Sequence, residues 1–200
     1  MSSQLDTKYH ILMQKEQKFS KSVAFESIDK PRASAWMIIA PLYLIYWMYR
    51  AKKYRHSVDA FAQNFLISKK WALEGAYEMA ANNISKKEMM RRFREQASQF
   101  GETEELQEYQ ALEMDILLDH FYKLLTAKGE TFAELLRSAY GSRKQFERFV
   151  EKLQDAERKI AQAALKNLDE LDMESAQEVA SNMEEATAKL RKKDAQEIFG

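Results

Sequence analysis

Apolar side chains recur every three or four residues along most of the chain, a spacing that places them on one face of an α-helix. The longest regular stripe consists of Phe146, Phe149, Val150, Leu153, Ala156, Ile160, Ala164, Leu168 and Leu171. A second stripe consists of Leu106, Tyr109, Leu112, Ile116, His120 and Leu124. Charged residues fill most of the positions between them. The two stripes predict helices that face each other in an antiparallel bundle or a coiled-coil seam.

Capping signals indicate where the helices begin. A serine or threonine followed three residues later by Glu or Gln satisfies two free amides at a helix start. This pattern occurs at Ser85, Thr131, Ser142 and Ser175. Together with stops at Asn and Gly residues, it predicts helices over 57–82, 85–99, 103–127, 131–139, 143–168 and 173–197. No segment reads as a β-strand, so we expect an all-α protein built as a multi-helix antiparallel bundle.

Composition supports a helical fold and excludes several kinds of site. The 200 residues include 5 Gly and 2 Pro, too few for the many turns of a β-rich chain. Cysteine is absent from the sequence, which excludes a disulfide framework and thiolate-ligated metal sites.

One segment departs from the amphipathic pattern. Residues 33–49, ASAWMIIAPLYLIYWMY, carry no charge and are apolar around the whole helix. Such a helix is buried in a large core or immersed in lipid, and a 200-residue chain with 31% charged residues has little protein to surround it. We therefore favour a membrane anchor. Its predicted members are Trp36, Ile38, Ile39, Pro41, Leu42, Tyr43, Ile45, Tyr46 and Trp47.

Pro41 lies at the midpoint of this segment and predicts a bend at Ala40-Pro41, because proline removes an amide donor and clashes with the preceding turn. A straight helix over the segment would be about 25 Å long, slightly short of a hydrocarbon core of about 30 Å. Three arrangements remain open: a re-entrant helix in one leaflet, a kinked single span, or a buried helix of a soluble core. The outline is similar to the re-entrant anchors of monotopic membrane enzymes.

Basic residues lie on both flanks of the segment and again farther along the chain. The predicted headgroup-facing residues are Arg32, Arg50, Lys52, Lys53, Arg55, Arg91, Arg92 and Arg94. Positive charge on both flanks is typical of a hairpin with both ends in the cytoplasm. Residues 1–100 have a net charge of +8 and residues 101–200 a net charge of −8. We expect anionic lipid headgroups as a partner rather than nucleic acid; mutual attraction of the two halves is the alternative.

The sequence offers little for catalysis. No Glu-x-x-His pair, glycine-rich phosphate loop or nucleophile elbow is present. Glu113 and His120 share a predicted helix face and could form an acid–base pair, although such a pair is more often structural. We therefore expect no catalytic residue, no cofactor and no metal.

These observations predict two regions. Residues 1–56 would hold an amphipathic helix and the anchor, and residues 57–200 a cytosolic helical bundle domain. The first helix could lie in the membrane plane or pack on the bundle. The expected function is a membrane-associated helical scaffold or adaptor that presents its bundle to a protein partner or to another copy. The alternatives are a soluble bundle with residues 33–49 as a core helix, and a monotopic enzyme acting on a lipid-soluble substrate.

Overall fold

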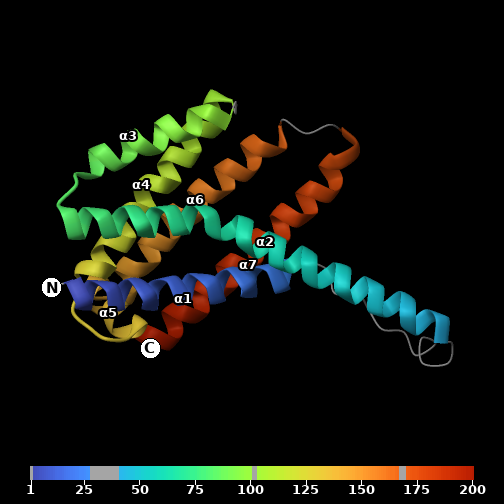
Figure 1. Ribbon diagram of the computed structural model, residues 1–200, viewed down its shortest axis with the longest axis horizontal. Coiled ribbons are helices and arrows are strands. Elements are labelled where there is room, and N and C mark those ends of the chain that lie inside the picture. Colours follow the sequence, from blue (N-terminus) through green and yellow to red (C-terminus); the bar gives the residue numbers. More distant parts are fainter. Residues whose placement is uncertain (1, 28–40, 101–102, 167–169) are drawn as a thin grey trace.

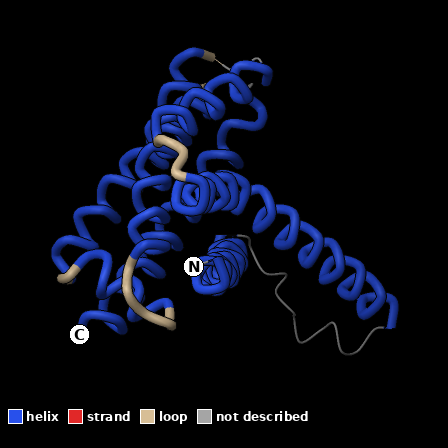
Figure 2. Tube along the Cα trace, turned by 60° about the vertical axis from the view of Figure 1, so that its left-hand side comes forward, coloured by secondary structure: helices blue, strands red, loops and turns tan. Residues whose placement is uncertain are grey.

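The computed structural model describes the backbone of residues 2–27, 41–100, 103–166 and 170–200, and all regular structure in these ranges is helical (Figure 1). Side chains are described for residues 3–27, 57–99, 103–166 and 176–200. The elements are α1 (Ser2–Ser27), α2 (Pro41–Asn82), α3 (Lys86–Ala97), a 3₁₀ turn (Ser98–Phe100), α4 (Glu104–Thr126), α5 (Phe132–Tyr140), α6 (Arg143–Leu165) and α7 (Glu170–Phe199). A short loop joins α2 to α3, and two further short loops join α4 to α5 and α5 to α6 (Figure 2). The prediction of an all-helical bundle is confirmed.

Three of the four predicted helix starts are confirmed by their caps. The side chains of Ser85 and Ser142 each accept a hydrogen bond from the amide three residues later. Thr131 forms a complete capping box with Glu134. The prediction at Ser175 is wrong, because α7 already begins at Glu170. A capping side chain accepts a hydrogen bond from an amide that is free only in the first turn of a helix. Inside a longer helix that amide is already bonded, so the same residues do not mark a helix start.

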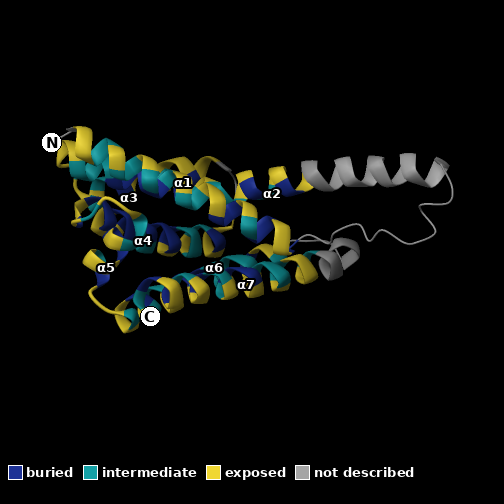
Figure 3. Cartoon of the chain, turned by 90° about the horizontal axis from the view of Figure 1, so that it is seen from below, coloured by how far each residue is buried: buried dark blue, intermediate teal, exposed yellow. Residues whose placement is uncertain are grey.

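Helix α4 is the centre of the bundle and contacts α1, α2, α3, α5 and α6. It contributes Met114, Leu117, Leu118, Phe121, Leu124 and Leu125 to the fully buried core. Figure 3 shows the buried positions gathered where the helices face one another. One close approach is made possible by Gly75 of α2, where a Cβ atom would lie 3.0 Å from Leu118 and Met89.

The predicted orientation of α4 is corrected by the structure. Leu112, expected on the buried stripe, is 40% exposed, whereas its neighbour Glu113 is 8% exposed. With five helices packed around it, α4 buries most of its circumference, and which side stays open depends on where those helices lie. Apolar spacing within α4 does not contain that information.

The first helix packs as a member of the bundle. Leu12, Phe19 and Val23 are buried, and Ala24 forms a cluster with Val58 and Ala62 of α2. Helix α1 also packs along α7, so the first and last helices of the chain are in contact. This is the second of the two arrangements that the sequence left open for α1.

Helix α2 begins at Pro41 and continues to Asn82. Proline suits the first turn of a helix, where its missing amide would have no partner. The expected boundary between residues 56 and 57 falls inside this helix. Among the residues that the structure describes, no helix is long and apolar enough to cross a membrane. Residues 33–40 of the predicted anchor lie outside the described backbone, and the side chains of residues 41–49 outside the described side chains.

The packing of α1 predicts that residues 57–200 alone form a poorly stable fragment. Each large buried side chain that is lost costs about 2–5 kcal/mol, against a total stability of about 5–15 kcal/mol for a domain. We expect the fragment to lose its cooperative urea transition in circular dichroism.

The matched control keeps α1 and replaces residues 28–56 with a flexible Gly-Ser linker. Because Ala24 and Val58 are in contact, a linker can join α1 to the packed part of α2 while both helices keep their places in the bundle. This variant should therefore unfold cooperatively. Equal stability of the fragment and the linker variant would contradict the prediction.

Candidate functional site

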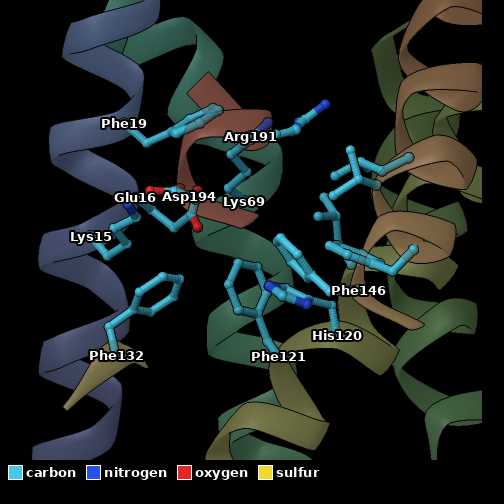
Figure 4. A pocket seen from close by; sticks show the side chains of 14 residues that line it. Lys15, Glu16, Phe19, Lys69, His120, Phe121, Phe132, Phe146, Arg191 and Asp194 are labelled. Carbon is cyan, nitrogen blue, oxygen red and sulfur yellow. Dashed lines mark hydrogen bonds and ion pairs between the residues drawn. The ribbon is translucent and has the colours of Figure 1, made fainter. Parts of the chain in front are cut away.

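Charged side chains from five helices meet inside the bundle, and Figure 4 shows three of them, Glu16, Lys69 and Arg191. Lys69 of α2 is 3% exposed, Arg191 of α7 6% and Glu113 of α4 8%. Glu157 of α6 and Glu16 of α1 are partly buried beside them. Burial of this many charges is expensive unless they are paired, so their partners decide what the cluster does. We call these five residues the ionic centre.

Glu157 is the carboxylate that holds the two cations. Arg191 donates through Nη1 and Nη2 to the two oxygens of Glu157, at 2.6 and 2.7 Å. The ammonium of Lys69 lies 3.4 Å from Oε1 of the same carboxylate. Burial opposes ionisation of Glu157, but the charges of Arg191 and Lys69 outweigh it and lower its pKa to about 2. Glu157 is therefore a carboxylate across the ordinary pH range.

The other two carboxyl groups have weaker partners. Glu113 accepts a hydrogen bond of 3.2 Å from the hydroxyl of Ser68. Within the described part of the chain, Glu16 has neither a hydrogen bond nor an ion pair. Burial raises the pKa of both groups, and the nearby cations Lys69 and Arg191 only partly offset it. Three carboxyl groups thus lie beside two cations, and burial disfavours the charged forms of Glu16 and Glu113.

A small cavity of about 50 Å³ adjoins the ionic centre. Its polar wall includes Glu16 and the ion pair between Lys15 and Asp194, whose atoms lie 2.7 Å apart. Its apolar wall is largely aromatic and contains Phe19, Phe121, Phe132, Phe146 and Phe149 together with Leu117, Val150 and Leu153. This space is sufficient for a few water molecules and too small for a typical organic substrate.

His120 lies on the aromatic side of this cavity. Its Nδ1 is 2.6 Å from the hydroxyl of Tyr140, and its ring stacks on Phe149 with centroids 4.1 Å apart. Burial, reinforced by the charges of Arg191 and Lys123, lowers the pKa of His120 to about 3, so the imidazole stays neutral. Glu113 and His120, which the sequence placed on one face, therefore have separate partners. An imidazole whose pKa is about 3 is a weak base, and its burial and ring stacking are typical of a structural residue.

No group of three or more His, Cys, Asp or Glu among the described residues is arranged to hold a metal ion. Lys69 and Arg191 supply the positive charge beside the buried carboxyl groups.

The predicted anchor residues fall only partly within the described chain. Trp36, Ile38 and Ile39 lie outside it, as does Arg32. The remaining anchor positions, Pro41, Leu42, Tyr43, Ile45, Tyr46 and Trp47, form the first turns of α2. The basic positions Arg50, Lys52, Lys53 and Arg55 follow on the same helix. The backbone of the anchor's second half and its basic flank are thus one continuous helix.

The basic residues of α3 lie elsewhere. Arg91 pairs with Glu88 and Glu95, and Arg92 bridges Glu78 and Glu88. Helix α3 packs beside the later part of α2, where Trp71 donates a 2.9 Å hydrogen bond to Gln96. Trp71 is about 24 Å along the helix from Arg55. The structure therefore does not bring the two basic groups together, and of the α3 arginines Arg94 alone has no ion pair with another described residue.

Sequence reasoning missed the ionic centre, although a signal for it existed. Glu16 lies four residues after Leu12 and three before Phe19, and Glu157 lies at the same spacings from Leu153 and Ile160. Both are therefore charges at positions of an apolar stripe, which favours burial with a partner. What the pattern cannot supply is the partner, since Lys69 and Arg191 come from other helices.

No protein-family model matches the chain, and no significant match is found among curated proteins or solved structures. The described residues define its class as an all-helical bundle with a buried ionic centre.

Substitution of Glu157 by Gln should lower the free energy of unfolding by about 3 kcal/mol at neutral pH, because it removes the carboxylate that forms the ion pairs with the buried Lys69 and Arg191. Glu16→Gln is the matched control, since it removes a carboxyl that lacks a partner and should be neutral or stabilising. Urea denaturation of both variants measures the difference. Equal losses in the two variants would contradict the assigned roles.

The directions of these pKa shifts predict how the free energy of unfolding depends on pH. The contribution of Glu157, whose pKa is lowered from 4.5 to about 2, is present above pH 4.5 and is lost as the pH falls toward 2. The contributions of Glu16 and Glu113, whose pKa values are raised above 4.5, are complete below pH 4.5 and are lost as the pH rises through the raised values. Stability should therefore decline on both sides of a mildly acidic range. Denaturation at several pH values should show the alkaline decline reduced in Glu16→Gln.

Proposed function

We propose that the protein is a membrane-associated helical scaffold or adaptor on the cytoplasmic side of a membrane. In this proposal the apolar segment 33–49 enters one leaflet and returns to the same side, and the bundle presents a helical surface to a protein partner. The observation that carries the proposal is the contact between Ala24 of α1 and Val58 of α2, because it fixes where the two ends of the intervening chain lie.

This contact favours a re-entrant anchor over a single span. If residues 33–49 crossed the bilayer once, residues 32 and 50 would lie on opposite sides, about 30 Å apart. Helix α1 ends at Ser27 beside the bundle, so residues 28–32 would have to cover that distance, and fully extended they reach at most about 18 Å. They would also carry unpaired backbone amides through lipid. A hairpin that returns to its own side does not require residues 28–32 to cover this distance or to place unpaired amides in lipid.

Helix α2 gives the proposed anchor a stiff connection to the bundle. Its amino-terminal part, which begins at Pro41, extends away from the other helices in Figure 1. The basic positions Arg50, Lys52, Lys53 and Arg55 lie between the apolar segment and the bundle. Each basic residue near an anionic surface contributes about 1 kcal/mol to binding. The arrangement supports an apolar tip in the leaflet with its basic flank at the headgroups.

Single-cysteine labelling tests this topology directly, because the natural chain has no cysteine. Lys21→Cys and Asp59→Cys place exposed thiols on α1 and α2, one on each side of the segment. In bacterial inverted membrane vesicles, where the cytoplasmic face points outward, a membrane-impermeant maleimide should label both. In intact spheroplasts it should label neither. If one of the two sites were labelled in inverted vesicles and the other in spheroplasts, the segment would cross the membrane once and the proposal would be overturned.

Two further variants complete the experiment. Ala40→Cys, within the segment, should be protected from the reagent in both preparations. The Gly-Ser linker variant that lacks residues 28–56 should leave the membrane fraction and remain folded. Wild-type protein that stays in the supernatant after membranes are sedimented would instead favour the soluble bundle.

A further inference from the structure

Helix α3 covers part of α4 and leaves an open groove between the two helices. The groove has a volume of about 800 Å³. Met90 and Phe93 of α3 form one apolar wall, and Ala111 and Leu112 of α4 form the other. Leu112 is 40% exposed, one of the few large apolar side chains in the described part of the chain to be so open. A groove of this kind between two helices is suited to receive other helices.

Opposite charges line the two rims. Arg94 lies on the α3 rim, and Glu104 and Glu108 lie on the α4 rim. None of the three forms an ion pair with a described residue, whereas the neighbouring charges are neutralised within the chain. Arg91 pairs with Glu88, and Lys86 lies 2.7 Å from Asp115. The groove therefore has one basic and one acidic rim, each with free charge.

We propose that this groove is the interface between two copies of the chain, related by a two-fold axis parallel to the groove. Helices α3 and α4 are joined through the turn Ser98–Phe100 and run in opposite directions, as the ion pair between Lys86 and Asp115 shows. Rotation about this axis sets α3 of one copy against α4 of the other at the same height. Such an interface is self-complementary, as a two-fold dimer requires.

The charges select this arrangement over its alternative. With the axis parallel to the groove, Arg94 of one copy faces Glu104 and Glu108 of the other, and Leu112 faces Met90 and Phe93 across the axis. With the axis perpendicular to the groove, α3 would face α3 and Arg94 would approach its own counterpart. Like charges set against one another at an interface are strongly unfavourable. The dimer would be a four-helix arrangement with an apolar centre and two charged rims.

A charge-swap experiment tests the interface with the full chain. Sedimentation equilibrium in density-matched detergent measures the dissociation constant of the wild type, Arg94→Glu and Glu108→Arg. Each variant should raise the dissociation constant about tenfold or more, because each dimer would contain two repulsive contacts. An equimolar mixture of the two variants should associate more tightly than either variant alone, since positions 94 and 108 again carry opposite charges at both of their contacts in the mixed dimer.

Matched controls separate this interface from general surface effects. Arg148→Glu changes an exposed arginine of α6, and Ile67→Gln changes an apolar side chain of α2 that is 63% exposed. Neither should alter association, whereas Leu112→Gln should weaken it. Thermal unfolding by circular dichroism verifies that each variant is folded. A wild type that is monomeric at every concentration, or a mixture that associates no more tightly than the separate variants, would overturn the proposal.

Discussion

The bidentate contact between Arg191 and Glu157, with Lys69 beside it, joins the last two helices of the chain to α2, which is distant in the sequence. Arg191 belongs to α7, Glu157 to α6 and Lys69 to α2. Taking these charges out of water is expensive, and the attraction between them offsets that cost only while all three are in place. A bundle in which one of these helices were rotated would leave a charge buried alone. We interpret the ionic centre as a constraint that selects one packing of the helices over others with a similar apolar pattern.

The same region ties α1 to the rest of the molecule. Lys15 pairs with Asp194, and Glu16 and Phe19 adjoin Arg191. The first helix therefore contacts the last one, and its side chains pack in the same core as those of the later helices. An independent domain would need a core that closes without α1, and Val23 and Leu12 are among its most deeply buried side chains. Helix α1 and the packed part of α2 belong to one bundle.

The proposed membrane segment and the proposed dimer interface lie at different places on the molecule. Helix α3 lies at the far end of α2 from Pro41 (Figure 1). Two copies could therefore associate through α3 and α4 while both apolar segments remained available to a membrane. A pair of anchors on one particle holds to a membrane much more tightly than a single one, because insertion of the second becomes intramolecular. The two proposals rest on separate residues, and each can fail without the other.

The sequence by itself determined the helical class and most helix ends, because those signals act within one turn. The caps at Ser85, Thr131 and Ser142, the stop before Gly141 and the spacing of apolar residues in α6 all depend on neighbours three or four positions away. The sequence also singled out residues 33–49, since a run without charges needs no partner to be recognised. Only the tertiary structure decided that Glu113 is buried and Leu112 exposed, that Glu157 holds Lys69 and Arg191, and that Ala24 touches Val58. Each of these depends on which helix lies opposite, and that is set by contacts between residues far apart in the chain.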